Sequence, residues 1–208
     1  MVMKTLDFGR LRLGAALILF SVVFAGCNLQ KQITALANMA KCTYKIDNLT
    51  GMTLANVNVQ GKSSLAQLNL SDATKLATAY LGGTMPLSMT LNMAVKNPNK
   101  EPAAMNKLKY ILALDGQNLT NGTIPNSFAV EANSTNTLPI QVNVDLKQVL
   151  AGKSKEEILN LILALSGQSQ KPTKLGLSIK PTFNIAGQAI EYPNYFNVAT
   201  EFGAGKVQ

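Results

Sequence analysis

The chain contains no histidine and no obvious catalytic motif. Histidine is the side chain whose ordinary pKa lies closest to neutral pH, so the most common general base is missing. No Ser-x-x-Lys, Gly-x-Ser-x-Gly, phosphate-loop or calcium-loop pattern is present either. Glu156 and Glu157 are adjacent, but neighbouring helical positions point about 100° apart and do not form a facing acid pair. We therefore predict a protein that is not an enzyme and that needs no cofactor.

Arginine is also absent after residue 12, although the chain is basic. From residue 27 onward, 16 lysines stand against 10 acidic residues, which gives a net charge of +6. Arginine is the preferred side chain for bidentate recognition of phosphate or guanine, and the lysines are spread from Lys31 to Lys206 without a basic run. This pattern favours solvated lysines over a nucleic-acid site.

Cysteine occurs only at positions 27 and 42. With so few thiols and no histidine, we expect no metal site. If Cys27 is modified, Cys42 has no partner for an intrachain disulfide and is most simply a small buried apolar residue.

The first 27 residues have the pattern of an export signal. Lys4, Arg10 and Arg12 form a basic start, and an apolar run of 12 residues follows from Leu13 to Phe24. A membrane-spanning helix needs about 20 apolar residues, so this run is too short to be one and is expected to be removed.

The segment Phe24-Ala25-Gly26-Cys27 resembles the lipobox that lipoprotein signal peptidase recognises. The resemblance implies a diacylglyceryl lipid on Cys27, and hence a membrane partner in a bacterial cell envelope, on the outer membrane and facing the periplasm. The alternatives are an ordinary signal peptide with a chance cysteine, or a retained anchor. We predict a signal peptide at 1–26, a lipidated tether at 27–41 and one domain at 42–208.

Within the tether, helical spacing is followed by Ile33, Leu36, Ala37 and Ala40. Part of the tether is therefore either extended or a short helix.

Strand-type alternation dominates the predicted domain. The clearest case runs from Leu87 to Val95, where every second residue is apolar, and Asn97-Pro98-Asn99 ends it. A second alternating segment, Leu108 to Leu114, leads into the hairpin dipeptide Asp115-Gly116, and Asn121-Gly122 is expected to be another turn. Further strands are predicted around 44–46, 54–59, 128–130, 138–146, 175–179, 183–185 and 187–192.

Two helices interrupt the strands. We predict one over 71–81, capped by Ser71 and ended by Gly82-Gly83, and one over 154–165, opened by the capping box Ser154 to Glu157. Strands joined by short turns, with one or two added helices, predict a mainly β fold: an antiparallel Ig-like or fibronectin-like β-sandwich.

One segment, from Leu87 to Gly122, contains Asn97-Pro98-Asn99 and the run Leu108 to Gly116. It resembles the group 2 late-embryogenesis-abundant proteins, also described as the WHy (water stress and hypersensitive response) domain. Leu138-Pro139-Ile140 is similar to the family as well. The resemblance implies a β-sandwich that is usually non-enzymatic, is linked to desiccation and stress, and in some relatives is linked to membranes or lipid. The helix at 154–165 and the export signal depart from the family pattern. Asn97, Pro98 and Asn99 are expected to fix a turn and not to contact a ligand.

The helix at 154–165 is apolar over most of its circumference. One apolar face is made by Ile158, Leu161, Ile162 and Leu165. A second is made by Leu159 and Leu163, which either complete a buried helix or form an apolar lip for a lipid or partner. Three hypotheses follow. The first is a lipid-anchored module that binds an envelope protein or protects against stress. The second is a carrier of lipid or of a small apolar ligand, with a pocket between sheets and helix, and the third is a hydrolase, which lacks a visible general base.

Overall fold

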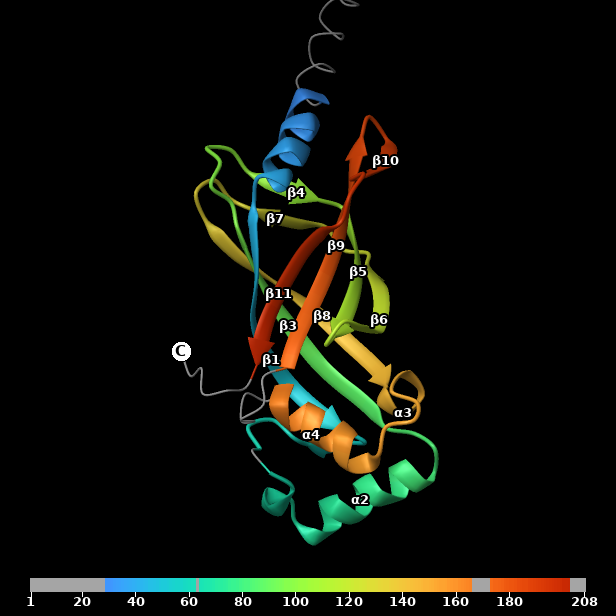
Figure 1. Ribbon diagram of the computed structural model, residues 1–208. Coiled ribbons are helices and arrows are strands. Elements are labelled where there is room, and N and C mark those ends of the chain that lie inside the picture. Colours follow the sequence, from blue (N-terminus) through green and yellow to red (C-terminus); the bar gives the residue numbers. More distant parts are fainter. Residues whose placement is uncertain (1–28, 63, 166–172, 203–208) are drawn as a thin grey trace, which may run out of the picture.

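The computed structural model describes residues 29–62, 64–165 and 173–202 and shows a mainly antiparallel β protein, elongated and sandwich-like, with helices at its two ends (Figure 1). The predicted signal peptide at 1–26 and Cys27 lie outside the described residues. The strands form two larger sheets and one small one, and a single apolar core lies between them.

The first sheet has the order β2-β1-β3-β8. Its strands are β1 (Thr43–Leu54), β2 (Val57–Asn58), β3 (Pro86–Lys96) and β8 (Thr135–Asp145). The register between β3 and β8 is unbroken from the Pro86–Asp145 pair to the Lys96–Thr135 pair. Every second residue of β3 from Leu87 to Val95 is buried, so the predicted alternation is confirmed.

The sequence predicts strands around 44–46 and 54–59 separated by Asn48 to Gly51, and this division is wrong, because β1 runs through residues 48–51 and the break falls between Leu54 and Val57. One continuous strand pairs with β3, and irregularities in register occur between Ile46 and Asn48 and between Thr50 and Thr53. Gly51 has φ +63°, a conformation that glycine adopts without strain. The turn-forming residues are therefore absorbed as bulges inside the strand.

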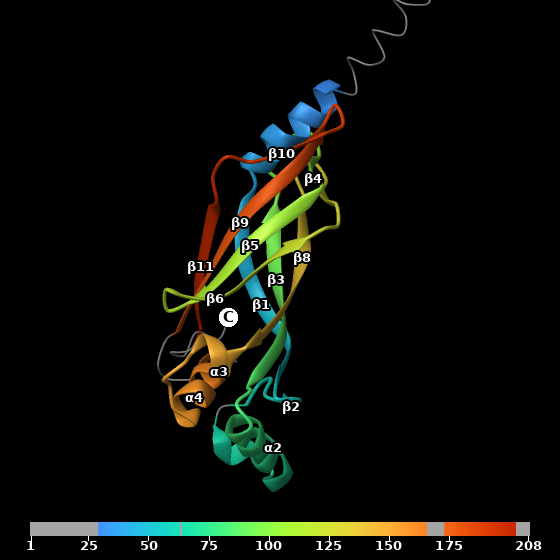
Figure 2. The same cartoon turned by 90° about the vertical axis from the view of Figure 1, so that its right-hand side faces the viewer.

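The second sheet has the order β10-β9-β5-β6, and β11 also pairs with β9. Its strands are β5 (Lys107–Leu114), β6 (Gln117–Ile124), β9 (Thr173–Ile185), β10 (Gln188–Glu191) and β11 (Phe196–Phe202). Asp115 and Gly116 have φ +48° and +83°, which suits a two-residue hairpin turn, as predicted. Figure 2 shows the two larger sheets as facing layers along the long axis.

Asn121-Gly122 was expected to be a turn, but both residues lie inside β6, opposite Ile111 and Tyr110. A Cβ at Gly122 would lie 2.7 Å from Tyr110 Oη, closer than atoms can approach. The glycine is needed because the Tyr110 ring crosses this position. Strand β11 was not predicted at all, and β9 is one strand where two were expected.

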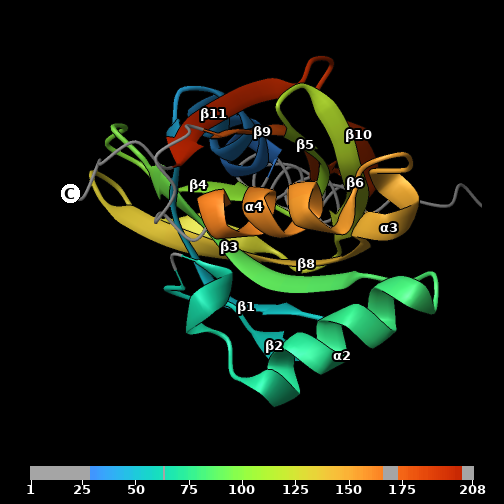
Figure 3. The same ribbon diagram turned by 60° about the horizontal axis from the view of Figure 1, so that its bottom comes forward.

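Four helical segments cover the ends. A helix over residues 29–40 lies at one end, beside the small sheet of β4 (Ala103–Met105) and β7 (Phe128–Val130). At the opposite end lie α2 (Leu70–Leu81), the short α3 (Leu146–Val149) and α4 (Lys155–Leu165), with the 3-10 turn η1 (Leu65–Gln67) preceding α2. Figure 3 shows α4 across the opening between the two larger sheets.

Local capping explains where these helices begin. The backbone N–H of Asp72 donates to Asn69 Oδ1 at 2.8 Å, so Asn69 caps α2 and not the predicted Ser71. In α4 the predicted capping box is present: Ser154 N donates to Glu157 Oε2 at 2.7 Å, and Glu157 N donates to Ser154 Oγ at 3.2 Å.

Candidate functional site

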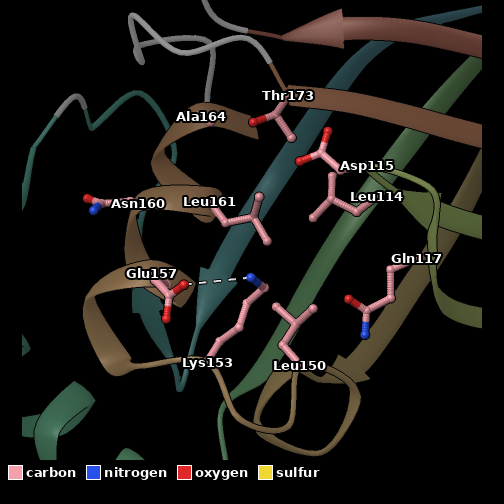
Figure 4. A pocket seen from close by; sticks show the side chains of 10 residues that line it. All are labelled: Leu114, Asp115, Gln117, Leu150, Lys153, Glu157, Asn160, Leu161, Ala164 and Thr173. Atoms are coloured by element: carbon pink, nitrogen blue, oxygen red, sulfur yellow. Dashed lines mark ion pairs between the residues drawn. The ribbon is translucent and has the colours of Figure 1, made fainter.

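A cavity of about 420 Å³ lies between α4 and the sheet ends, where the β5–β6 turn meets the start of β9. Its apolar floor is formed by Leu114, Leu150 and Leu161, which Figure 4 shows turned toward one another. A volume of this size falls within the range typical of small-ligand pockets. The position corresponds to the pocket between sheets and helix that a carrier would need.

Polar groups around the cavity are largely engaged in holding its walls together. The Lys153 ammonium lies 3.7 Å from Glu157 Oε1, and the Asp115 carboxylate accepts from the backbone N–H of Lys174 at 2.8 Å. Gln117 donates to the carbonyl oxygen of Val149 at 2.7 Å. The cavity therefore combines an apolar floor with a polar rim whose groups bond to the protein itself.

The Glu157 carboxylate is held ionised by local hydrogen bonds. The backbone N–H of Ser154, then its hydroxyl, and then the Lys153 charge lower the pKa of Glu157 below its ordinary range. A carboxyl whose pKa is lowered is a poor general acid at neutral pH. Its role at this position is to cap α4.

Leu159 and Leu163 do not form the apolar lip that was considered as a binding surface. Leu159 is 4% exposed and Leu163 is 6% exposed, and Leu159 belongs to the core cluster together with Ile158 and Ile162. Both apolar faces of α4 are therefore covered by protein, while Asn160 stays exposed. Of the apolar residues on α4, Leu161 is the one that lines the cavity and remains partly exposed.

Asn97 lies at the opposite end of the molecule and is completely buried. Its amide nitrogen donates to three backbone carbonyl oxygens at 3.0 Å, those of Glu101, Val130 and Glu131. Its Oδ1 accepts from both nitrogens of Asn99, the backbone N–H at 3.0 Å and the side-chain amide at 2.6 Å. This side chain joins the loop after β3 to the segment after β7.

Asn99 extends this arrangement to the N-terminal helix. Its side-chain amide donates to the Asn38 carbonyl oxygen at 3.0 Å, and Asn38 in turn donates to the Pro102 carbonyl oxygen at 3.2 Å. Pro98 is exposed beside them. We call Asn38, Asn97 and Asn99 the asparagine network. Its contacts are to backbone groups and to one another, so Asn97-Pro98-Asn99 acts here as a structural junction.

The N-terminal helix is attached to the domain by this network and by apolar contacts. Met39 is fully buried, and Leu36 packs on the core. The Cys42 thiol donates to the Asn38 carbonyl oxygen at 3.4 Å, and burial raises the pKa of that thiol. Of the two alternatives for this segment, the helix on the domain is the one that the structure shows from residue 29 onward.

Metal ligands do not cluster in the described part of the chain: no group of three or more Cys, Asp or Glu side chains is placed to hold an ion. Within the same described ranges, no helix has both the length and the apolar character needed to cross a membrane.

Comparison with known proteins gives one family match. Residues 92–190 match the family model described as "Late embryogenesis abundant protein". Over these residues the chain is similar to that family. The matched region begins inside β3 and ends inside β10, so it includes Asn97, Asn99 and α4, and it covers a little under half of the 208 residues. None of the curated proteins matches the chain.

Solved structures show weaker likenesses. A protein from Archaeoglobus fulgidus is 15% identical with a TM-score of 0.36, covering 78% of this chain and 100% of its own. A protein from Arabidopsis thaliana is 16% identical with a TM-score of 0.39, covering 56% of this chain and 70% of its own. A protein assigned to the late embryogenesis abundant (LEA) group is 16% identical with a TM-score of 0.36, covering 97% of this chain and 95% of its own. Scores of this size do not by themselves establish a shared fold.

Sequence reasoning raised a pocket between sheets and helix only as a hypothesis, without its lining residues, and it missed the full asparagine network. The cavity residues come from 114–117, 150–164 and 173, which are far apart along the chain. Asn38 was treated as part of a tether, and nothing in the local pattern indicates its contact with Asn99. The capping box did locate Glu157, and Asp115-Gly116 did locate the hairpin turn at the cavity rim.

Proposed function

We propose that this protein is a non-catalytic, lipid-anchored module of the bacterial cell envelope that binds or protects other envelope components under stress. The observation that carries the proposal is the match of residues 92–190 to the late embryogenesis abundant family, in a chain whose first 27 residues have the pattern of a lipoprotein export signal. In this proposal the lipid on Cys27 holds the protein on the outer membrane, with the domain in the periplasm.

The described residues support a binding role in preference to chemistry. The carboxylates at the cavity are used to cap α4 and to hold β9, and the Cys42 thiol is buried with a raised pKa. A buried thiol with little thiolate is a weak nucleophile. These groups stabilise the fold, so activity would depend on surfaces and on position.

The anchor is tested by metabolic labelling with an acyl probe. The wild-type chain should incorporate the probe and fractionate with membranes, whereas Cys27→Ser should do neither. Cys42→Ser serves as the matched control and should label like the wild type, because Cys42 is buried in the domain. A Cys27→Ser protein that still incorporates the probe contradicts the proposal.

The stress role is tested by survival after drying or osmotic shock. A strain lacking the gene should survive less well, and the wild-type gene should restore survival while the Cys27→Ser gene should not. Equal survival of the deletion and wild-type strains would remove the stress role, and full rescue by Cys27→Ser would show that anchoring is unnecessary.

A second candidate, favoured by the cavity under α4, is a carrier of lipid or a small apolar ligand. Native mass spectrometry of the purified domain should then show a bound small molecule. Leu161→Asn should release it, because this side chain faces the cavity, while Leu81→Asn on exposed α2 should not. A ligand-free spectrum for the wild-type protein purified from its own membrane would exclude the carrier role.

A further inference from the structure

The apolar face of the N-terminal helix extends beyond the domain that buries it. Residues 29, 33, 36 and 40 lie on one helical face because they are spaced by three or four positions. The C-terminal half of that face is covered, with Leu36 packed on the core. In the N-terminal half, Leu29 is 39% exposed and Ile33 is 50% exposed. The same stripe is thus buried by protein at one end and uncovered at the other.

A second apolar residue is presented at the same end by β10. Ile190 is 42% exposed, and the turn before β10 is joined to the helix, since the backbone N–H of Ala186 donates to Gln32 Oε1 at 2.9 Å. Figures 1 and 2 both show β10 close to the N-terminal helix and remote from α2. Lys31 is exposed on the same turn of the helix, but it is two positions from both Leu29 and Ile33 and therefore lies on a different face from the apolar stripe.

The proposed lipid lies next to this end. Two residue steps separate Cys27 from Leu29, so their Cα atoms are at most about 7 Å apart. Because residues 36–40 are fixed to the domain, there is no long tether over which the domain could move away from the lipid. An interfacial helix buries its apolar face by about 5 to 10 Å at the boundary of headgroups and acyl chains, a depth that single side chains can reach.

Resting on the proposed lipid at Cys27, we infer that the end formed by the N-terminal helix and β10 is a second, protein-borne contact with the bilayer. Leu29 and Ile33 enter the interface, and Ile190 lies against it. The domain then stands end-on, with α2, α4 and the cavity directed away from the membrane.

Depth-dependent quenching tests this orientation on the full lipidated protein. The chain contains no tryptophan, so one introduced tryptophan is a unique fluorophore. The variants are Leu29→Trp, Ile33→Trp and Ile190→Trp, and the controls are Leu70→Trp and Leu81→Trp, which replace exposed leucines at the opposite end. All five sites are exposed enough to accept the larger ring. Each protein is reconstituted in vesicles of phosphatidylcholine and phosphatidylglycerol, once with brominated and once with unbrominated acyl chains, and the two emission intensities are compared.

We expect the tryptophans at 29 and 33 to lose roughly half of their emission in brominated vesicles, the one at 190 to lose less, and the two controls to lose none. If Cys27 is acylated but positions 29 and 33 are not quenched, the inference is wrong while the proposed anchor stands. If quenching at 70 or 81 equals that at 33, the domain lies flat and the end-on orientation is wrong. If the wild-type chain is not acylated at all, the proposed function itself fails.

Discussion

The two ends of the sandwich are attached to it in different ways. At the N-terminal end, the asparagine network places a fully buried amide among backbone carbonyl oxygens and fixes the helix at 29–40 to the loop after β3. At the far end, α2 buries only Leu76, and its Leu70 and Leu81 are 84% and 85% exposed. A buried polar network tolerates one arrangement only, whereas α2 is held by Leu76 and by the partly buried Ala79 and Tyr80, which restrict its position less. The end next to the proposed lipid is therefore the better fixed of the two.

The largest effect is expected in β3, the strand that joins the two ends. Leu91→Asp would place an unpaired charge at a fully buried position and should cost about 4 kcal/mol or more, enough to unfold the domain. Asn92→Asp on the partly exposed face should cost about 1 kcal/mol or less, since it alters side-chain hydrogen bonds to Asn48 and Thr50. Thermal melting measures both, and equal losses would show that the two faces of β3 do not differ as described.

Removal of the network's central side chain should come next. Asn97→Ala leaves three carbonyl oxygens and the Asn99 amide without their partner and should cost about 3 kcal/mol. The matched control is Asn136→Ala, which removes two exposed hydrogen bonds, one to the Ala129 carbonyl oxygen and one from the Thr137 backbone N–H, and should cost about 1 kcal/mol or less. Denaturant unfolding gives both values, and a small loss at Asn97 would remove the basis for calling this end the better fixed one.

At the far end, α4 and α2 should respond differently. Leu159→Gln places a polar group in the core and should cost about 2 kcal/mol, while Asn160→Gln at the adjacent exposed position should be close to neutral. If Leu159→Gln leaves the melting temperature unchanged, α4 is not the buried plug of the sandwich that its low exposure indicates.

The smallest effect is expected in α2. Leu81→Ser changes a residue that is 85% exposed and should alter the free energy of unfolding by no more than about 0.5 kcal/mol. A loss of stability comparable to that of Leu159→Gln would mean that α2 is covered in solution, for example by a second molecule of the protein. In that case the loss of stability would depend on protein concentration.

Local patterns predicted the parts of the fold that local physics determines. The alternation in β3, the hairpin at Asp115-Gly116 and the capping box at Ser154 each lie within a few residues and were found where expected. The failures have a tertiary cause. Asn48 to Gly51 has the composition of a turn, but pairing with β3 keeps it in a strand, and Gly122 is a strand residue because Tyr110 needs the space.

The sites show the same division between local and distant signals. The residue types of Asn97, Pro98 and Asn99 predict a turn. The burial of Asn97, however, depends on the backbone carbonyl oxygens of Glu101, Val130 and Glu131. The link from Asn99 to the N-terminal helix depends on Asn38. The orientation of Leu159 and Leu163 depends on what covers α4. A helix that is apolar nearly all round does not reveal this from its own sequence.

Hydrogen exchange of the lipidated, membrane-bound protein tests the central claim most directly, because a docked helix and a tether differ most in the protection of their backbone amides. Amides 36–40 should exchange as slowly as those of β3, amides of α2 should exchange faster, and Asn97→Ala should selectively accelerate 36–40. Exchange of 36–40 within seconds in the wild-type protein would show a free tether, and the account of a fixed, membrane-facing end would then be wrong.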